Sequence, residues 1–246
     1  MKQRRRYDQP IRSATMTKTC HRTGVASVEV GRVTGSRSAR TFDEISVEEP
    51  LEIRLAVHTA DTAPTTIAVT MRTPGHDVDL AAGFLFTEGI INGAEDIEDL
   101  RRTGFNAVEA RLQPGVNPDV TRLDRHSFVS SSCGACGKRS IAAVRVASRH
   151  PIVPEIPHLS PEVIHGLPGA LRASQSGFSR TGGIHASGLF DADGHLLALR
   201  EDVGRHNALD KLIGSELLAG RIPLAGRIVL VSGRVSFELV QKAAIA

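Results

Sequence analysis

The chain has little of what several classes of protein depend on. Its 246 residues include no Trp, one Tyr and three Cys, at positions 20, 133 and 136. The scarcity of aromatic side chains argues against a stacking platform for single-stranded nucleic acid, and three cysteines cannot build a disulfide-stapled domain. Even the longest apolar runs, such as that of residues 228–231, are short. The sequence therefore predicts a soluble globular protein without a membrane span.

Positive charge is concentrated at the start of the chain. The net charge of +3 and the pI near 9.0 would by themselves suggest a nucleic-acid partner. Residues 1–24, however, hold seven Lys or Arg against one acid, whereas residues 25–246 hold 23 basic and 26 acidic residues. We therefore expect a basic disordered tail over residues 1–24, which lacks the apolar stretch of a secretory signal, and a slightly acidic body that binds no nucleic acid.

Short alternating and β-branched segments predict the strands of the first half. Residues 51–57 and 65–71 are predicted to form a hairpin, and Asp77 to cap a helix that ends near Gly89. The acidic stretch 92–102 is predicted to lie on the surface, and residues 107–112 to form a strand. Further expectations are a strand at 127–129, a loop around the cysteines, a helix from Lys138, and a proline-rich linker over residues 151–161.

The second half has a more regular pattern. It predicts a helix at 162–174, a hairpin of strands 184–190 and 195–200, a helix at 204–218 with Leu218 on its apolar face, a buried strand at 228–231 and a helix at 236–244. This order predicts an α/β layered fold, with an N-terminal α/β portion (25–150) that carries the cysteine loop and a C-terminal α/β portion (162–246). Because the last helix is not followed by a strand, we expect the C-terminal portion to be truncated.

The strongest chemical feature is the pair Cys133-Gly-Ala-Cys136. It could be half of a zinc site, but the chain has no second C-x-x-C, and although His126, His185 or His206 could complete such a site, no spacing singles them out. It could belong to a nucleobase deaminase, but no histidine is followed two residues later by the Glu that such enzymes need. The remaining use is thiol chemistry, which the flanking Ser and Gly residues and the neighbouring Lys138 and Arg139 favour over a buried structural pair.

Ionisable and amide side chains are concentrated over residues 200–211, where a predicted strand ends and a helix begins. Such junctions form ligand crevices in α/β folds, and helix N-termini favour anions. Here Arg205 and Lys211 could hold phosphate, and Glu201 or Asp202 could bind a guanine edge or a ribose, although a salt-bridged surface helix is the alternative. Two further turns favour a pocket, so the candidate cofactor-binding residues are Thr181, Gly182, Gly183, His185, Arg200, Asp202, Arg205, His206, Asn207, Lys211, Ser232, Gly233 and Arg234.

Taken together and in order, these stretches resemble the formate dehydrogenase accessory sulfurtransferase family, the FdhD-type proteins. The resemblance covers roughly residues 25–244 and is far more specific than a lone C-x-x-C. The motifs that carry it are Met71–Asp77, Gly83–Leu85, Glu88–Ile90, Ser132–Gly137, Thr181–His185, Arg200–Lys211, Ser232–Arg234 and Ser236–Glu238.

The resemblance implies a function. Members of the family accept sulfane sulfur from a cysteine desulfurase and pass it to molybdenum in the bis(molybdopterin guanine dinucleotide) cofactor, which is then inserted into formate dehydrogenase. It implies that Cys133 carries the persulfide, that Cys136 is its companion, that the cofactor is a bound substrate, and that protein side chains hold no metal. Two alternatives are a cofactor-delivery chaperone without obligatory thiol chemistry and a C-x-x-C structural metal protein.

The resemblance also implies a structural and cellular context. It predicts a cytidine-deaminase-like layered core with a second, smaller α/β portion, a homodimer and a cytoplasmic location. Family members usually continue beyond the helix at 236–244 with another strand and a nucleotide-binding loop. This is a second reason to expect that the C-terminal portion is truncated.

Overall fold

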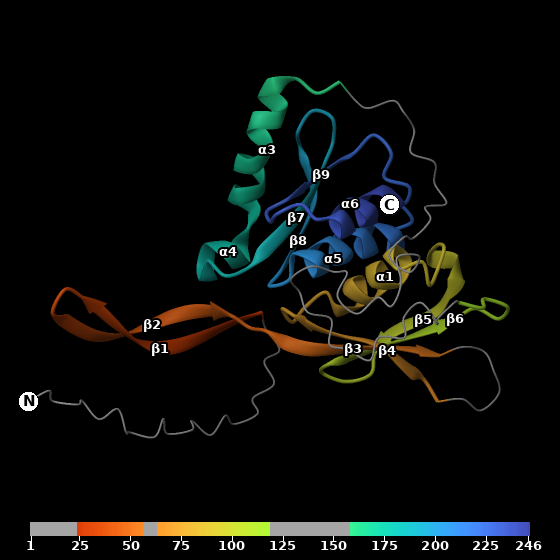
Figure 1. Ribbon diagram of the computed structural model, residues 1–246, viewed down its shortest axis with the longest axis horizontal. Helices are drawn as coiled ribbons and strands as arrows, with labels where there is room; N and C mark the ends of the chain where they lie inside the picture. Colours follow the sequence, from red (N-terminus) through yellow and green to blue (C-terminus); the bar gives the residue numbers. More distant parts are fainter. Residues whose placement is uncertain (1–23, 57–62, 119–157) are drawn as a thin grey trace, which may run out of the picture.

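The computed structural model describes residues 24–56, 63–118 and 158–246, and it confirms the α/β class (Figure 1). The elements in chain order are β1 (Val25–Thr34), β2 (Arg37–Ser46), β3 (Glu49–Ala56), β4 (Thr65–Arg72), α1 (Asp77–Thr87), the 3-10 helix η1 (Ala94–Asp96), β5 (Ile97–Arg102), β6 (Ala107–Leu112), α3 (Pro161–Ser174), α4 (Ser176–Thr181), β7 (His185–Phe190), β8 (Leu196–Asp202), α5 (Arg205–Leu218), β9 (Ile228–Val231) and α6 (Phe237–Ile245).

A four-stranded sheet of order β4-β3-β6-β5 forms one outer layer. The predicted hairpin of β3 and β4 is confirmed, and β3 also pairs in parallel with β6. Alternate residues of β3, namely Leu51, Ile53 and Leu55, are buried in the main core, as a half-buried strand requires. The stretch 92–102, which was expected to be surface, in fact contains β5, the edge strand that pairs with β6 and keeps its polar side chains at least partly exposed.

Helices α1 and α5 cross in the middle of the molecule, between the two sheets (Figure 1). Their backbones approach so closely that a Cβ on Gly83 would overlap the carbonyl oxygen of Asp210, and one on Gly214 would overlap that of Asp79. Glycine is therefore required at both positions. Helix α5 is covered on nearly every side, so the predicted apolar face is only part of its buried surface. Leu218, which was predicted to lie on that face, is exposed.

A three-stranded antiparallel sheet of order β8-β7-β9 packs on the other side of α5. The predicted hairpin of β7 and β8 is confirmed, and Gly194 adopts a positive φ of 86° in its turn. The prediction of a buried strand at 228–231 is wrong in its burial, since β9 is half-buried at the sheet edge in the part of the chain described. Helix α3 covers the outer face through Leu167 and Leu171.

Two helix starts differ in detail from the predictions. Asp77 does not cap α1, because it is the first helical residue and is buried against Arg72, while His76 occupies the N-cap with a φ of 56°. Pro161, predicted as the last residue of the linker, is the first residue of α3, and Ser160 caps that helix by accepting from the backbone of Val163. The fixed φ of proline suits it to this first helical position.

The main core contains residues from both predicted portions, for example Leu80 of α1 and Leu209 of α5. Within the described ranges, no helix is both long enough and apolar enough to cross a lipid bilayer. The predicted strand at 127–129, the cysteine loop, the helix from Lys138 and most of the linker lie outside the described residues. The cytidine-deaminase-like character of the core stays a prediction.

Candidate functional site

Three turns of the chain meet at one end of the β8-β7-β9 sheet. Strand β7 runs antiparallel to both neighbours, so its first residues lie beside the last residues of β8 and β9. His185 is paired with Asp202, and the backbone N–H of Ser232 donates to the carbonyl of Ala186 at 2.9 Å. The turns that precede β7 and follow β8 and β9 therefore converge, which brings together the three polar segments picked out in the sequence.

A cavity of about 720 Å³ opens at this convergence, a volume within the usual range for small-molecule sites. Its walls are mostly apolar, with a few polar groups among them. The lining residues are Pro168, Leu171, Arg172, Gln175 and Phe178 from α3 and α4, Gly182, Gly183, Ile184, His185 and Val203 from the turns and β7, and Leu230, Val231 and Ser232 from the end of β9. Helix α5 begins beside it at Gly204, where no side-chain cap is formed among the described residues.

His185 is the titratable cavity residue that the sequence had predicted. Its pKa is lowered by partial burial and by the nearby Arg205 guanidinium, against a smaller opposing effect of Asp202, so the ring is neutral near pH 7. Its Nδ1 lies 3.4 Å from the Ser232 hydroxyl, which itself accepts a hydrogen bond from the Ala186 N–H at 2.9 Å. A neutral imidazole offers a ligand one N–H donor and adds no charge to the cavity.

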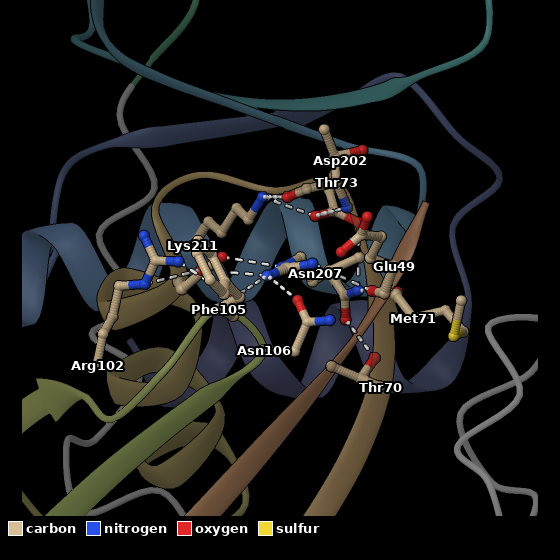
Figure 2. Close-up of polar contacts among 12 residues, drawn as sticks. Glu49, Thr70, Met71, Thr73, Arg102, Phe105, Asn106, Asp202, Asn207 and Lys211 are labelled. Carbon is tan, nitrogen blue, oxygen red and sulfur yellow. Dashed lines mark hydrogen bonds and ion pairs between the residues drawn. The ribbon is translucent and has the colours of Figure 1, made fainter. Parts of the chain in front are cut away.

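Asp202 is the centre of a buried network beneath the cavity (Figure 2). Its Oδ2 lies 2.7 Å from Lys211 Nζ and accepts from the Thr73 N–H at 3.1 Å. Its Oδ1 accepts from the Gly204 N–H at 2.8 Å and from Asn207 Nδ2 at 3.2 Å. These contacts compensate the cost of burying the carboxylate and fix the turn between β8 and α5.

The same network attaches α5 to the end of β4. Lys211 donates to the Thr73 carbonyl at 2.8 Å, and Asn207 donates to the Met71 carbonyl at 2.7 Å and accepts from the Thr70 hydroxyl (Figure 2). Lys211 and Asn207 are buried, and their side-chain polar atoms already have partners in Thr73, Asp202, Met71 and Thr70. Both side chains therefore hold α5 against the end of β4, next to the cavity.

A second buried pair, Arg72 with Asp77, lies in the same region. The Arg72 guanidinium makes two hydrogen bonds to the Asp77 carboxylate, at 2.9 and 3.2 Å. It also donates to the Glu49 and Phe105 carbonyls and to Asn106 Oδ1, all between 3.1 and 3.3 Å. Because guanidinium donors are satisfied in several directions, this arginine joins β3, the start of α1 and the turn before β6.

The remaining predicted residues lie near the cavity but do not line it. The Thr181 hydroxyl lies 2.7 Å from that of Ser46 on β2, Arg200 donates to Asp79 on α1 at 3.0 Å, and His206 Nε2 lies 3.2 Å from the Ser236 hydroxyl. A Cβ on Gly233 would lie 3.1 Å from Arg205 Cδ and 3.4 Å from His185 Cε1, so this turn is packed against two other candidates. Arg234 is exposed, and Cys133 and Cys136 lie outside the described residues.

Several cavity residues were not predicted. Arg172 stacks on the Phe178 ring with its guanidinium carbon 4.5 Å from the ring centre, and both line the cavity. Glu201, which was predicted with Asp202 as a possible partner of a guanine edge or a ribose, does not line this cavity and instead accepts hydrogen bonds from the Gly177 and Phe178 N–H groups at the start of α4. For Arg172 and Phe178, the sequence offered no signal beyond the nearness of α4 to Thr181-Gly182-Gly183.

The C-terminal helix is attached by a third buried ion pair. Lys242 Nζ lies 2.9 Å from Asp210 Oδ2, 2.8 Å from the Thr87 hydroxyl and 3.5 Å from Glu88 Oε1. Burial raises the pKa of Asp210 to about 6, with the attraction of Lys242 acting in the opposite direction. Since α6 follows the Ser232 turn directly, this attachment also determines where that wall of the cavity lies.

One group of side chains among the described residues has the spacing of a metal site. Asp191, Asp193 and His195 lie on the turn between β7 and β8 and are largely exposed. Asp191 Oδ1 already accepts from the backbone N–H groups of Asp193 and His195, which is the contact expected of a polar turn residue. The arrangement is explained by the turn.

Comparison with known families identifies this architecture. The model of the FdhD/NarQ family matches residues 46–246. "Sulfur carrier protein FdhD" of Streptomyces avermitilis is 47% identical over 215 residues, covering 83% of this chain and 73% of the relative. The proteins of the same name from Nocardia farcinica and Saccharolobus solfataricus are 44% and 38% identical, covering 88% and 89% of this chain and 77% and 79% of the relatives.

A solved structure shows the same fold. The crystal structure described as a formate dehydrogenase accessory protein from Desulfotalea psychrophila superposes with a TM-score of 0.66. It covers 90% of this chain and 80% of its own, at 23% identity. The superposition supports the arrangement of the layers, but a sequence identity of 23% does not identify a ligand.

Proposed function

Because the chain belongs to the FdhD/NarQ family, we propose that it is a sulfur carrier that serves formate dehydrogenase. In this proposal Cys133 takes persulfide sulfur from a cysteine desulfurase and transfers it to the bis(molybdopterin guanine dinucleotide) molybdenum cofactor, which is the bound substrate. The observation that carries the proposal is the family match over residues 46–246, which includes Cys133-Gly-Ala-Cys136. A cytoplasmic location, where thiols stay reduced, is part of the proposal.

The cavity at the end of the β8-β7-β9 sheet supports the binding of a guanine nucleotide end of the cofactor. Its apolar walls and the Phe178 ring suit a planar base, and the neutral His185 ring can donate one hydrogen bond to a carbonyl or phosphate oxygen. The start of α5 and Arg205 lie beside it and favour an anion. Asp202 and Lys211 contribute by holding the turn in place.

The two cysteines supply a balanced route for the sulfur. The Cys133 thiolate attacks the terminal sulfur of the desulfurase persulfide, which leaves a persulfide on Cys133 and a thiolate on the desulfurase. Attack of the Cys136 thiolate on the Cys133 sulfur then forms a Cys133–Cys136 disulfide and releases the outer sulfur as sulfide for the metal, in place of an oxygen ligand lost as water. A thiol reductant returns the disulfide to two thiols, which completes the cycle.

Persulfide labelling tests the thiol step. The protein is incubated with a cysteine desulfurase and cysteine, and persulfide sulfur is then detected by mass spectrometry. Cys133→Ala is expected to abolish the label, whereas Cys20→Ala, the matched control, is expected to keep it. Cys136→Ala is expected to take up sulfur but to fail in restoring formate dehydrogenase activity. A label of undiminished intensity on Cys133→Ala would contradict the proposal.

The same variants separate sulfur transfer from cofactor delivery without thiol chemistry. The size of the cavity is the observation that favours the delivery function. If the double Cys133→Ala, Cys136→Ala protein fully restores formate dehydrogenase activity in cells that lack the chain, delivery alone is the function. If activity is lost although the double variant still binds nucleotide, the thiols are needed.

Nucleotide binding tests the cavity independently of the cysteines. Isothermal titration with GDP is expected to show binding that His185→Leu weakens by about tenfold, because the imidazole N–H donor is lost. His195→Leu is the matched control, since this exposed histidine lies at the other end of the same hairpin. Equal GDP affinity for all three proteins would show that the nucleotide does not use this cavity.

A further inference from the structure

Gln175 joins α3 to α4 and lines the cavity at the end of the β8-β7-β9 sheet. The residue is buried, with 4% of its surface exposed. Within the described residues its hydrogen bonds are made by the backbone, and its side-chain amide has no partner. The amide is not sealed in the protein interior, so it reaches the space of the cavity that the residue lines.

The backbone that carries this amide is held in place on both sides. The Gln175 N–H donates to the Arg172 carbonyl at 3.4 Å, and the Gln175 carbonyl accepts from the N–H and the hydroxyl of Ser179 at 3.0 and 2.7 Å. The N–H of Gly177 donates to the Glu201 carboxylate at 2.8 Å, which fixes the start of α4. The junction is therefore ordered before a ligand arrives, which lowers the entropic cost of binding.

The other polar side chains of the cavity have partners in the protein. Arg172 donates to the Ser179 hydroxyl at 2.9 Å, and His185 Nδ1 lies 3.4 Å from the Ser232 hydroxyl. A buried polar group without a partner is uncommon, because it has lost hydrogen bonds to water without replacing them. The hydrogen-bonding capacity of the Gln175 amide is thus left for a ligand.

The chemistry of an amide indicates what such a ligand carries. An amide has an acceptor oxygen beside two N–H donors, and it is uncharged. It therefore pairs with the edge of a neutral ring in which a carbonyl stands next to an N–H. Guanine has this edge in its O6 and N1–H groups, and a pterin ring has the same edge. The Phe178 ring in the cavity wall suits the flat face of either ring.

We propose that Gln175 recognises the ligand by this edge, with its amide N–H donating to the ring carbonyl and its amide oxygen accepting from the adjacent ring N–H. The inference rests on the proposed function, because it names the group that holds a ring of the cofactor in this cavity. Gln175 is then a specificity residue. A site with a buried partner for the carbonyl and N–H rejects a ring of the same shape that lacks them.

Calorimetric titration compares GDP with the 5′-diphosphate of purine riboside, which keeps the ring, sugar and phosphates but lacks the carbonyl and the N1–H. Gln175→Leu is expected to weaken GDP binding about 30-fold, through the loss of two hydrogen bonds, and to weaken binding of the analogue about threefold or less. Gln113→Leu, at an exposed position after β6, is the control and should bind both nucleotides as the unaltered chain does.

Thermal unfolding without ligand separates recognition from support of the fold. Since leucine replaces a buried amide that has no partner in the described structure, Gln175→Leu should unfold at the same temperature as the unaltered chain or at a higher one. A lower unfolding temperature would show that the amide supports the fold, and would overturn the proposal.

Guanosine and 6-hydroxymethylpterin, neither of which carries a phosphate, compare the two rings directly. The ring that binds more tightly and loses its affinity in Gln175→Leu is the one that the amide holds. Unchanged GDP affinity in Gln175→Leu, or an equal loss for GDP and the purine analogue, would overturn the role of Gln175 and leave the proposed function standing. An unaltered chain that binds neither GDP nor the pterin would overturn the use of the cavity itself.

Discussion

The network beneath the cavity and the arm, which is the hairpin of β1 and β2 that projects from the body (Figure 1), use the same chemical groups to different effect. Lys211 and Asp202 form an ion pair at 2.7 Å with both side chains at most 1% exposed, whereas Arg40 and Glu29 form one at 3.4 Å with side chains 83% and 50% exposed. A buried charge that loses its partner cannot be hydrated, but an exposed one can. Removing one member should therefore matter greatly under the cavity and little on the arm.

The two regions also differ in what their charged side chains can do. Under the cavity, Asp202, Asn207 and Lys211 are engaged with protein atoms, so they determine the shape of the site more than its direct contacts. On the arm, the charged side chains of Arg40 and Glu29 are paired but stay largely exposed to solvent. The same types of charged residue therefore hold the structure together in one region and remain hydrated in the other, according to their burial.

The largest expected effect follows from Lys211→Met, which leaves the Asp202 carboxylate buried without its counter-ion. We expect the free energy of unfolding to fall by about 3–5 kcal/mol, measured by urea denaturation. The matched control adds Asp202→Asn to Lys211→Met, and it should recover part of the loss because the unpaired charge is removed. A loss below about 1 kcal/mol in the single variant would show that the pair is not the support of the turn.

The next effect concerns pH and Asp210. Its pKa is raised by burial to about 6, so the folded protein takes up a proton on this group at a higher pH than the unfolded chain does. A raised pKa means that the contribution of this carboxyl to stability grows as pH falls below about 6 and is lost as pH rises through that value.

The measurement compares the unaltered chain with Asp210→Asn. Between pH 7 and pH 5, the unaltered chain should gain about 1 kcal/mol relative to this variant, because it binds the additional proton. Glu216→Gln, which alters a carboxylate paired with the mostly exposed Arg221, is the control and should follow the unaltered chain. A stability difference between the two proteins that does not change with pH would show that Asp210 stays ionised over this range.

A smaller effect is expected at the half-buried pair of Arg200 and Asp79, whose side chains are 22% and 19% exposed. Partial burial acts to raise the pKa of Asp79, but hydrogen bonds from His76 and Arg200 outweigh it and hold the pKa below its usual value. The stabilisation is therefore present at neutral pH and lost as pH falls through that lowered pKa. Arg200→Gln should cost about 1 kcal/mol at pH 7 and less at acidic pH, by thermal unfolding.

The smallest effect is expected on the arm. Arg40→Gln should leave the free energy of unfolding within about 0.5 kcal/mol of that of the unaltered chain, because solvent replaces the lost partner. Urea denaturation checks this value. A loss as large as that of Lys211→Met would end the distinction between the two regions.

Much of the regular structure could be predicted, because its signal is local. The alternation in β3, the β-branched residues of β4 and the Asp191–Gly194 turn each identify an element whose pattern repeats over a few residues. The arm was harder to predict, since only the start of β1 alternates between half-buried and exposed residues and the rest of the hairpin is mostly exposed. Strand β5 was missed because an edge strand with polar side chains has the composition of a surface loop.

Part of the candidate site could be predicted because its turns also have a local sequence signal. His185, Gly183 and Ser232 belong to turns with a distinct composition, and the fold places them around one cavity. Phe178 and Arg172 could not be predicted as cavity residues, because their role depends on how α3 and α4 pack on the sheet. The use of Asp77 as a partner of Arg72 likewise depends on a contact across the start of α1.

The sequence by itself determined the α/β class, most helices and strands, the polar turns and the family, since these follow from local periodicity and ordered motifs. Only the tertiary structure decided which charged residues are buried supports and which stay exposed. Burial depends on the packing of α1, α5 and the two sheets, which join residues more than a hundred positions apart, such as Thr73 and Lys211. The cost of removing a charge from water makes that difference decisive for what each residue can do.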